Sequence, residues 1–143
     1  MTDSPMFDTA PILTHDAVIA MMQNGIAKAT EIGQPQCLVI VDASGETIGS
    51  LRMSGAKYLS MRSARTKART AAANRAATGG MDEGFAAKIA AATGNAVTNL
   101  QGGLPVMIDG RLAGAVGVGS GTGEQDVAVG TAMLEAVGAD TVG

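Results

Sequence analysis

The sequence predicts an α+β fold: a single antiparallel sheet of four to five strands, built from two β-hairpins and flanked by helices. Three observations predict it. A length of 143 residues suits one domain of ordinary size. Two apolar stretches are each interrupted by a turn signal, and hairpin-connected strands cannot form an all-parallel sheet. Helical patterns fill the chain before, between and after these stretches, so the expected order is helix, hairpin, two helices, hairpin, helix.

The first part of the chain predicts a loose arm followed by a helix. Residues 1–12 contain two prolines and no periodicity, so we expect a flexible arm before a domain of residues 13–143. Thr14 is suited to N-cap a helix that runs to about Ile32. Apolar residues recur along this segment at helical spacing: Val18, Ile19, Met22, Ile26 and Ala29.

The first hairpin is expected directly after this helix. Cys37–Val41 is a short apolar run typical of a buried strand, and Glu46–Met53 is the returning strand. Between them, Asp42 and Gly45 are residue types typical of a turn. Cys37 is the only cysteine, which excludes an internal disulfide, and its place in the apolar run predicts a small buried side chain rather than a nucleophile.

Two helices are expected in the middle of the chain. Ser60–Arg75 contains no proline or glycine and many alanines, which favours a helix. The pair Gly79–Gly80 interrupts it, and a second helix is expected to begin at Met81 or Asp82. The spacing of four apolar residues predicts the buried face of that second helix: Phe85, Ile89, Ala92 and Ala96.

The second hairpin carries the strongest turn signal in the chain. Asp109–Gly110 is a two-residue connection of the type I′ kind between the apolar runs Leu104–Ile108 and Arg111–Val118. Gly114 and Gly117 in the second run indicate either a close backbone approach or a bound ligand.

A glycine-rich turn joins this hairpin to the last helix. Thr122 and Gln125 are spaced as a capping box, which starts a helix running to about Val137. The segment Gly119–Gly123 lacks the spacing of a dinucleotide-binding loop, and it follows a hairpin strand rather than a strand of a βαβ unit. Its position before a helix N-terminus leaves two interpretations open: a cradle for an anion or carboxylate, or a flexible connector.

Charge and composition limit the classes of partner. The net charge is −3, yet seven of the ten basic residues lie in a stretch without acidic residues between Glu46 and Asp82. An acidic protein with one local basic segment is a poor candidate for nucleic-acid binding and a better one for a small anionic ligand. No signal peptide and no apolar run long enough for a membrane span are visible, which predicts a cytoplasmic protein. With one Tyr, two Phe and no Trp, the core must consist of small residues, and contacts within a homo-oligomer are expected to complete its burial.

Two titratable residues are candidates for catalysis. Lys67 lies beside the alanine face of its helix, where its amine could bind an anion or, if desolvated, transfer a proton. Glu124 lies in the first turn of the last helix, where an acid also stabilises the helix dipole. His15 is the only histidine and stands at a helix start, so we expect a surface or capping role for it and no metal site.

Two blocks of sequence resemble the GlcG/HbpS family. The first is residues 41–55 (VDASGETIGSLRMSG) with the helical segment 64–71 (ARTKARTA). The second and more specific block is residues 102–118 (GGLPVMIDGRLAGAVGV), followed by 121–126 (GTGEQD). The resemblance covers about residues 13–138. It implies a small antiparallel sheet flanked by helices, homo-oligomers, and relatives that bind or degrade haem, accompany glycolate-utilisation operons or are fused to a corrinoid adenosyltransferase.

The resemblance also implies a ligand pocket between the basic helix and the glycine-rich turn. The residues expected there are Arg52, Lys67, Gly102, Gly103, Pro105, Ser120, Gly121, Thr122, Gln125 and Asp126. The leading hypothesis is an oligomeric protein that binds a small anionic or planar ligand, either a tetrapyrrole such as haem or a small organic acid. The alternative is a cofactor-independent lyase or isomerase of a catabolic pathway that acts on a carbonyl or carboxylate compound, with Lys67 or Glu124 transferring the proton. A structural subunit that needs no ligand is the third hypothesis.

Overall fold

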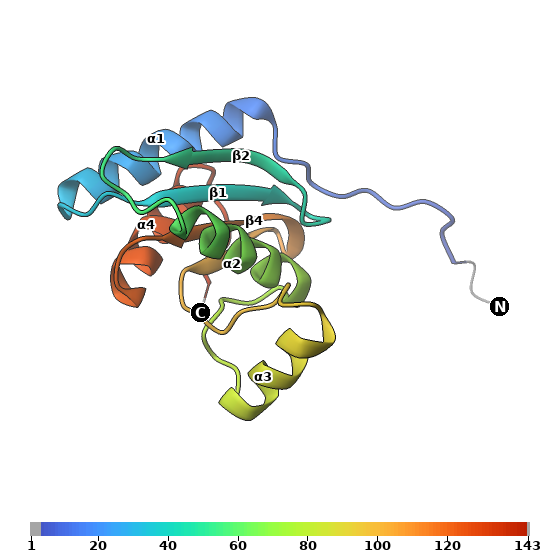
Figure 1. Ribbon diagram of the computed structural model, residues 1–143. Coiled ribbons are helices and arrows are strands. Elements are labelled where there is room, and N and C mark those ends of the chain that lie inside the picture. Colours follow the sequence, from blue (N-terminus) through green and yellow to red (C-terminus); the bar gives the residue numbers. More distant parts are fainter. Residues whose placement is uncertain (1–3, 143) are drawn as a thin grey trace.

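The computed structural model describes residues 4–142, which form four helices and one four-stranded sheet (Figure 1). The order of elements expected from the sequence is confirmed, and the sheet has four strands rather than five. The first three residues of the expected arm, and Gly143, lie outside the described residues. In chain order the elements are α1 (His15–Glu31), β1 (Cys37–Asp42), β2 (Thr47–Arg52), α2 (Ser60–Asn74), α3 (Glu83–Ala92), β3 (Gly103–Ile108), β4 (Arg111–Gly119) and α4 (Gly123–Glu135).

The sheet has the strand order β2-β1-β4-β3, and every neighbouring pair is antiparallel. The two hairpins therefore meet through their inner strands, where Cys37 of β1 faces Gly119 of β4. The second hairpin has the predicted type I′ turn, since Asp109 and Gly110 both have positive φ angles, of 50° and 76°.

Helices cover both faces of this sheet, so the molecule has three layers (Figure 1). On one face, Leu38 and Ile40 of β1 pack with residues of α1 and α4, including Met21 and Met133. On the other face, Cys37, Val39 and Val41 pack against the alanines of α2. Burial on both faces explains why β1 is a continuous apolar run rather than an alternating one.

The close approach expected at the β4 glycines is confirmed. A Cβ atom added at Gly117 would overlap the carbonyl oxygen of Ala64 in α2. The α2 backbone therefore rests directly on β4, with no space left there for a ligand. This contact fixes the height of α2 above the sheet and so the position of every side chain that α2 carries.

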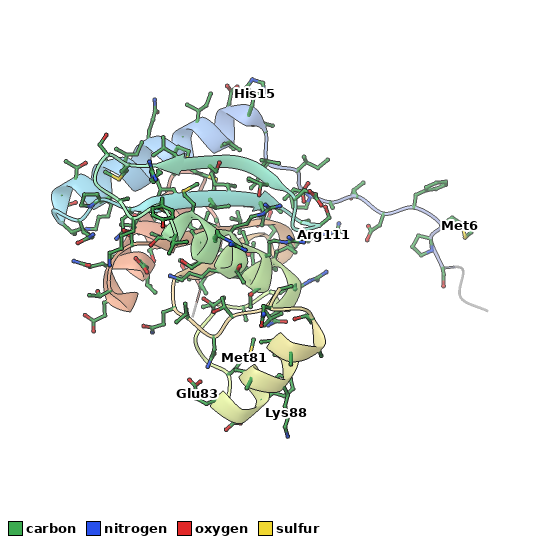
Figure 2. The ribbon with its side chains drawn as sticks, in the orientation of Figure 1. Met6, His15, Met81, Glu83, Lys88 and Arg111 are labelled. Carbon is green, nitrogen blue, oxygen red and sulfur yellow. The ribbon has the colours of Figure 1, made fainter. Side chains whose placement is uncertain are left out.

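The expected burial of α3 is wrong. None of its residues is buried, and the Phe85 side chain, expected in the core, is 55% exposed. Of the other three residues expected on the buried face, Ala92 and Ala96 are exposed as well and Ile89 is partly covered. Figure 1 shows α3 projecting from the three-layered body, and Figure 2 shows the side chains of Met81, Glu83 and Lys88 around it. Helical spacing reports which residues share a face, but not whether another element covers that face.

The predicted helix caps are confirmed. The Thr14 hydroxyl accepts a hydrogen bond from the Ala17 amide, and Thr122 and Gln125 form the complete capping box. The last helix ends at Glu135, two residues before the expected end. No helix in residues 4–142 has the length and apolar character needed to cross a bilayer.

Candidate functional site

A polar cavity of about 440 Å³ lies where the first turns of α2 and α4 meet the segment before β3. Leu100 contributes the single apolar side chain among its described lining residues. The others are glycines and polar residues from three separate stretches of the chain: Lys57, Ser60, Ser63, Lys67, Asn99, Gln101, Ser120, Gly121, Gly123 and Asp126. The predicted residues Lys67, Ser120, Gly121 and Asp126 are thus brought together.

The floor of the cavity is an ion pair. The Nζ atom of Lys67 lies 2.9 Å from Oδ2 of Asp126 and 2.8 Å from the carbonyl oxygen of Val118. The two charged side chains are only 6% and 3% exposed. An ammonium group has three protons, and these two contacts use two of them, so one donor remains for a ligand.

The Asp126 carboxyl is held in place from several sides. Its Oδ1 atom accepts a hydrogen bond from the Gly121 amide at 3.1 Å. The Gln36 side chain is fully buried beside it, and both Gln36 side-chain polar atoms lack a hydrogen bond of ordinary geometry within residues 4–142. Burial raises the pKa of Asp126, and Lys67 and the Gly121 amide oppose this shift without cancelling it. A carboxyl in this setting holds its proton more tightly than one in water.

The glycine-rich turn is less open to anions than the sequence suggests. The Gly121 amide donates its hydrogen bond to the Asp126 carboxyl. The Thr122 amide donates its hydrogen bond to the Gln125 side chain as part of the capping box. Thr122 and Gln125 therefore serve the helix start rather than the cavity. The amide of Gly123, which lines the cavity, belongs to the first turn of α4, where a helix offers no acceptor, so it is the donor available to a ligand.

Ser120 has a strained backbone that fixes one rim of the cavity. Its φ angle is 87°, a conformation rare for residues other than glycine. Its hydroxyl accepts a hydrogen bond from the Lys57 amide at 3.0 Å, and its carbonyl accepts one from the Gln34 side chain at 2.9 Å. Strain of this kind persists only where the surroundings enforce it, and it is concentrated at functional sites.

The predicted glycines Gly102 and Gly103 allow the chain to pass close to Lys67. A Cβ atom at Gly102 would lie 3.1 Å from the Lys67 Nζ and 2.6 Å from the Val118 carbonyl oxygen, so a side chain there would push into the ion pair. Gly103 lies against the backbone of Lys67 and the side chain of Thr78. Pro105 is buried in β3 opposite Ala115 and does not line the cavity.

Two other predicted residues lie outside the cavity lining. Arg52 is exposed at the end of β2, in register with Cys37 and two strands away from Gly119. Glu124 is exposed in the first turn of α4. Asp126, two residues further on, is the carboxyl that the fold places beside Lys67.

Several lining residues carry no functional signal in the sequence. Lys57, Ser60 and Ser63 come from the start of α2 and the turn before it, while Asn99 and Gln101 come from the segment after α3. Lysines and serines in such places are usually solvated, so only the fold identifies them. Cys37 is confirmed as a buried residue, and burial raises the pKa of its thiol.

Comparisons with known proteins place the chain in a family. The family model "Haem degrading protein HbpS-like" matches residues 13–135. The chain belongs to the HbpS-like family. A Citrobacter freundii relative, "Uncharacterized 15.0 kDa protein in dhaT-dhaS intergenic region", is 38% identical over 120 residues, 80% of this chain and 84% of the relative. Protein GlcG of Escherichia coli K12 is 33% identical over 111 residues, 77% of this chain and 83% of GlcG.

A solved relative shows the same fold. The structure described as "Crystal Structure of PduOC:Heme Complex" superimposes with a TM-score of 0.84 at 25% identity, covering 92% of this chain and 99% of that one. The resemblance to the GlcG/HbpS family is therefore confirmed, together with its antiparallel sheet flanked by helices.

The residues of this cavity do not fit an iron-bound haem. Its described lining offers two lysine amines and no His, Cys, Met or Tyr side chain as an axial ligand. His15 begins α1 and does not line the cavity, and its side chain is 89% exposed (Figure 2). A macrocycle needs large apolar side chains around it, and Leu100 is the single one in the described lining. Within residues 4–142, no group of three His, Cys, Asp or Glu side chains could hold a metal ion.

Proposed function

We propose that this HbpS-like protein binds a small organic acid in the cavity between α2 and α4. The observation that carries the proposal is the polar lining, with the Lys67–Asp126 pair at the floor and Lys57 at the edge. Because Asp126 neutralises Lys67, the Lys57 ammonium group supplies the net positive charge. A cavity of about 440 Å³ suits a compact ligand with several hydrogen-bonding groups.

The acid would be held from both helices. Its carboxylate would accept hydrogen bonds from the Lys57 ammonium and from the amide of Gly123, where the α4 dipole favours negative charge. The hydroxyls of Ser60 and Ser63 would bind further oxygen atoms. Arg52 would contribute only to the surrounding field, since it lies outside the lining.

Calorimetric titration with lactate tests this proposal. Wild-type protein should bind lactate, and Lys57→Ala should weaken binding about tenfold, as expected for one charge-assisted hydrogen bond. Lys88→Ala is the matched control, because it removes the same charge from exposed α3, away from the cavity lining. Equal losses in both variants would indicate a general charge effect and refute the proposed site.

Haem is the second candidate ligand. The family description and the relative solved with haem favour it. A haem molecule would need contacts beyond the cavity described above, and exposed Tyr58, Leu59 and Leu100 near its edge provide apolar surface. A saturable, shifted Soret band on titration with haemin would support this candidate. A spectrum identical to that of free haemin would leave the organic acid as the ligand.

A lyase or isomerase reaction is the alternative function for the same cavity. The buried Lys67–Asp126 pair favours it, because burial raises the pKa of the Asp126 carboxyl, and a carboxyl in direct contact with Lys67 can exchange a proton with a bound ligand. Glu124 would take part only through a ligand that reaches beyond the cavity lining. Turnover of a 2-oxo acid that persists in a Lys67→Met variant would exclude Lys67 as the proton-transfer group.

Assembly into a homo-oligomer belongs to the same proposal. The exposed apolar side chains of α3 and the segment after it support it, with Phe85 and Leu100 both more than half exposed. Light scattering during size-exclusion chromatography should give a mass above the 14.2 kDa of one chain. A monomer at high protein concentration would contradict the expectation.

A further inference from the structure

A second cavity, of about 300 Å³, adjoins the first one. It lies between α4, the start of β3 and residues 139–142, and it is largely apolar. The large apolar side chains in its wall are those of Leu104, Val127, Leu134 and Val142. Gln101 lines both cavities, and no other described residue does.

The Gln101 side chain fills the space over two glycines. Its Cγ atom would lie 2.7 Å from a Cβ atom added at Gly79, and its Oε1 atom would overlap one added at Gly123. The side chain therefore extends from the loop before α3 to the first residue of α4. Gln101 therefore lies over two positions without side chains, at the border of both the polar cavity and the apolar one.

The backbone around Gln101 is held by hydrogen bonds, whereas its side chain is held by packing over Gly79 and Gly123. The Thr78 hydroxyl donates a hydrogen bond to the Leu100 carbonyl and accepts one from the Gly103 amide, so the residues on both sides of Gln101 are tied to one point. No hydrogen bond to the Gln101 side chain is found within residues 4–142. Truncating this side chain would therefore join the cavities without disturbing the chain that carries it.

We infer that Gln101 determines the length of the acid that the site accepts. The carboxylate would bind in the polar cavity, as the proposed function requires, and the tail would point toward the apolar one. In the wild-type protein Gln101 stops the tail, so short acids are preferred. With Gln101 removed, an unbranched alkyl tail would reach the apolar wall around Leu104 and Leu134.

A chain-length series measures this directly. Affinities for butyrate, hexanoate and octanoate would be determined by calorimetry for wild-type protein and for Gln101→Ala. Each methylene group transferred from water strengthens binding about fourfold. In Gln101→Ala, hexanoate should therefore bind roughly 15-fold more tightly than butyrate. In the wild-type protein the affinity should not rise with chain length.

A second variant shows where the tail lies. Ala139 lines the apolar cavity and is remote from the ion pair, so Ala139→Phe fills that space. Combined with Gln101→Ala, it should abolish the gain for hexanoate while leaving butyrate binding unchanged. Thermal melts confirm that the variants are folded.

The outcomes separate this inference from the proposed function. If butyrate binds to both proteins with the same chain-length profile, Gln101 does not set the length and the inference is overturned, while the binding site stands. If neither lactate nor butyrate binds to wild-type protein, the proposed function fails and this inference fails with it. A gain for hexanoate that survives Ala139→Phe also overturns the inference, because the tail would lie elsewhere.

Discussion

The buried Lys67–Asp126 pair predicts an unusual pattern of stabilities among three variants. At 2.9 Å and an effective dielectric constant of about 20, the attraction between the two charges is about 6 kcal/mol. Each ion also loses its hydration, which costs several kcal/mol per group. The raised pKa of Asp126 indicates that this loss exceeds the gain from Lys67. The pair therefore contributes little net stability, although each member depends strongly on the other.

The perturbation is to remove the charges singly and together. Lys67→Met leaves the buried Asp126 carboxylate without its counter-ion, and Asp126→Leu does the same to the ammonium group. Each should lower the free energy of unfolding by about 3–5 kcal/mol. The double variant replaces both ions with apolar groups and should lie within about 1 kcal/mol of the wild-type protein.

Urea unfolding followed by far-ultraviolet circular dichroism measures these differences, since the chain has no Trp for fluorescence. The four proteins form a double-mutant cycle, whose interaction free energy isolates the pair. A double variant whose loss equals the sum of the two single losses would refute the reasoning. Such additivity would mean that the two side chains stabilise the fold independently, through packing alone.

Two further predictions concern pH and packing. Folding raises the pKa of Asp126, so the folded protein binds the Asp126 proton more tightly than the unfolded chain does. The contribution of Asp126 to the free energy of unfolding therefore falls as pH rises from the ordinary carboxyl range through the raised pKa. Urea titrations of wild-type protein and Asp126→Asn across that range should show the decline in the wild-type protein only, and parallel curves would contradict it. Gly117→Ala should lower stability by about 1–3 kcal/mol, because its Cβ atom would overlap the Ala64 carbonyl. Gly80→Ala, which meets open space, is the control for calorimetric melting and should stay within about 0.5 kcal/mol of wild type.

Local chemistry made most of the fold predictable. Asp109–Gly110 dictates a type I′ turn, and Thr122 with Gln125 dictates a helix start, whatever the rest of the chain does. The apolar run that begins at Cys37 requires burial on both faces, and the structure provides it. The prediction from helical spacing that Phe85 is buried is wrong, because the apolar face of α3 faces no other described element.

The site was only partly predictable, for a related reason. The place of Lys67 beside the alanine face of its helix predicts a side chain that points toward a pocket, and the structure places it there. Lys57 and Gln101 carry no such signal, since they become neighbours of Lys67 only when the turn before α2 and the segment after α3 meet. Glu124 and Asp126 are equivalent acids in the sequence, and only the rotation of α4 selects Asp126 for the cavity.

The most direct test of the central claim is to map lactate onto the protein by nuclear magnetic resonance. Titration of ¹⁵N-labelled protein with lactate should shift the amide signal of Gly123 most, together with those of Ser60 and Ser63 at the other wall. All of these shifts should saturate with one dissociation constant. Shifts confined to residues outside the cavity, or a spectrum unchanged by lactate, would contradict the assignment of this cavity as an organic-acid site.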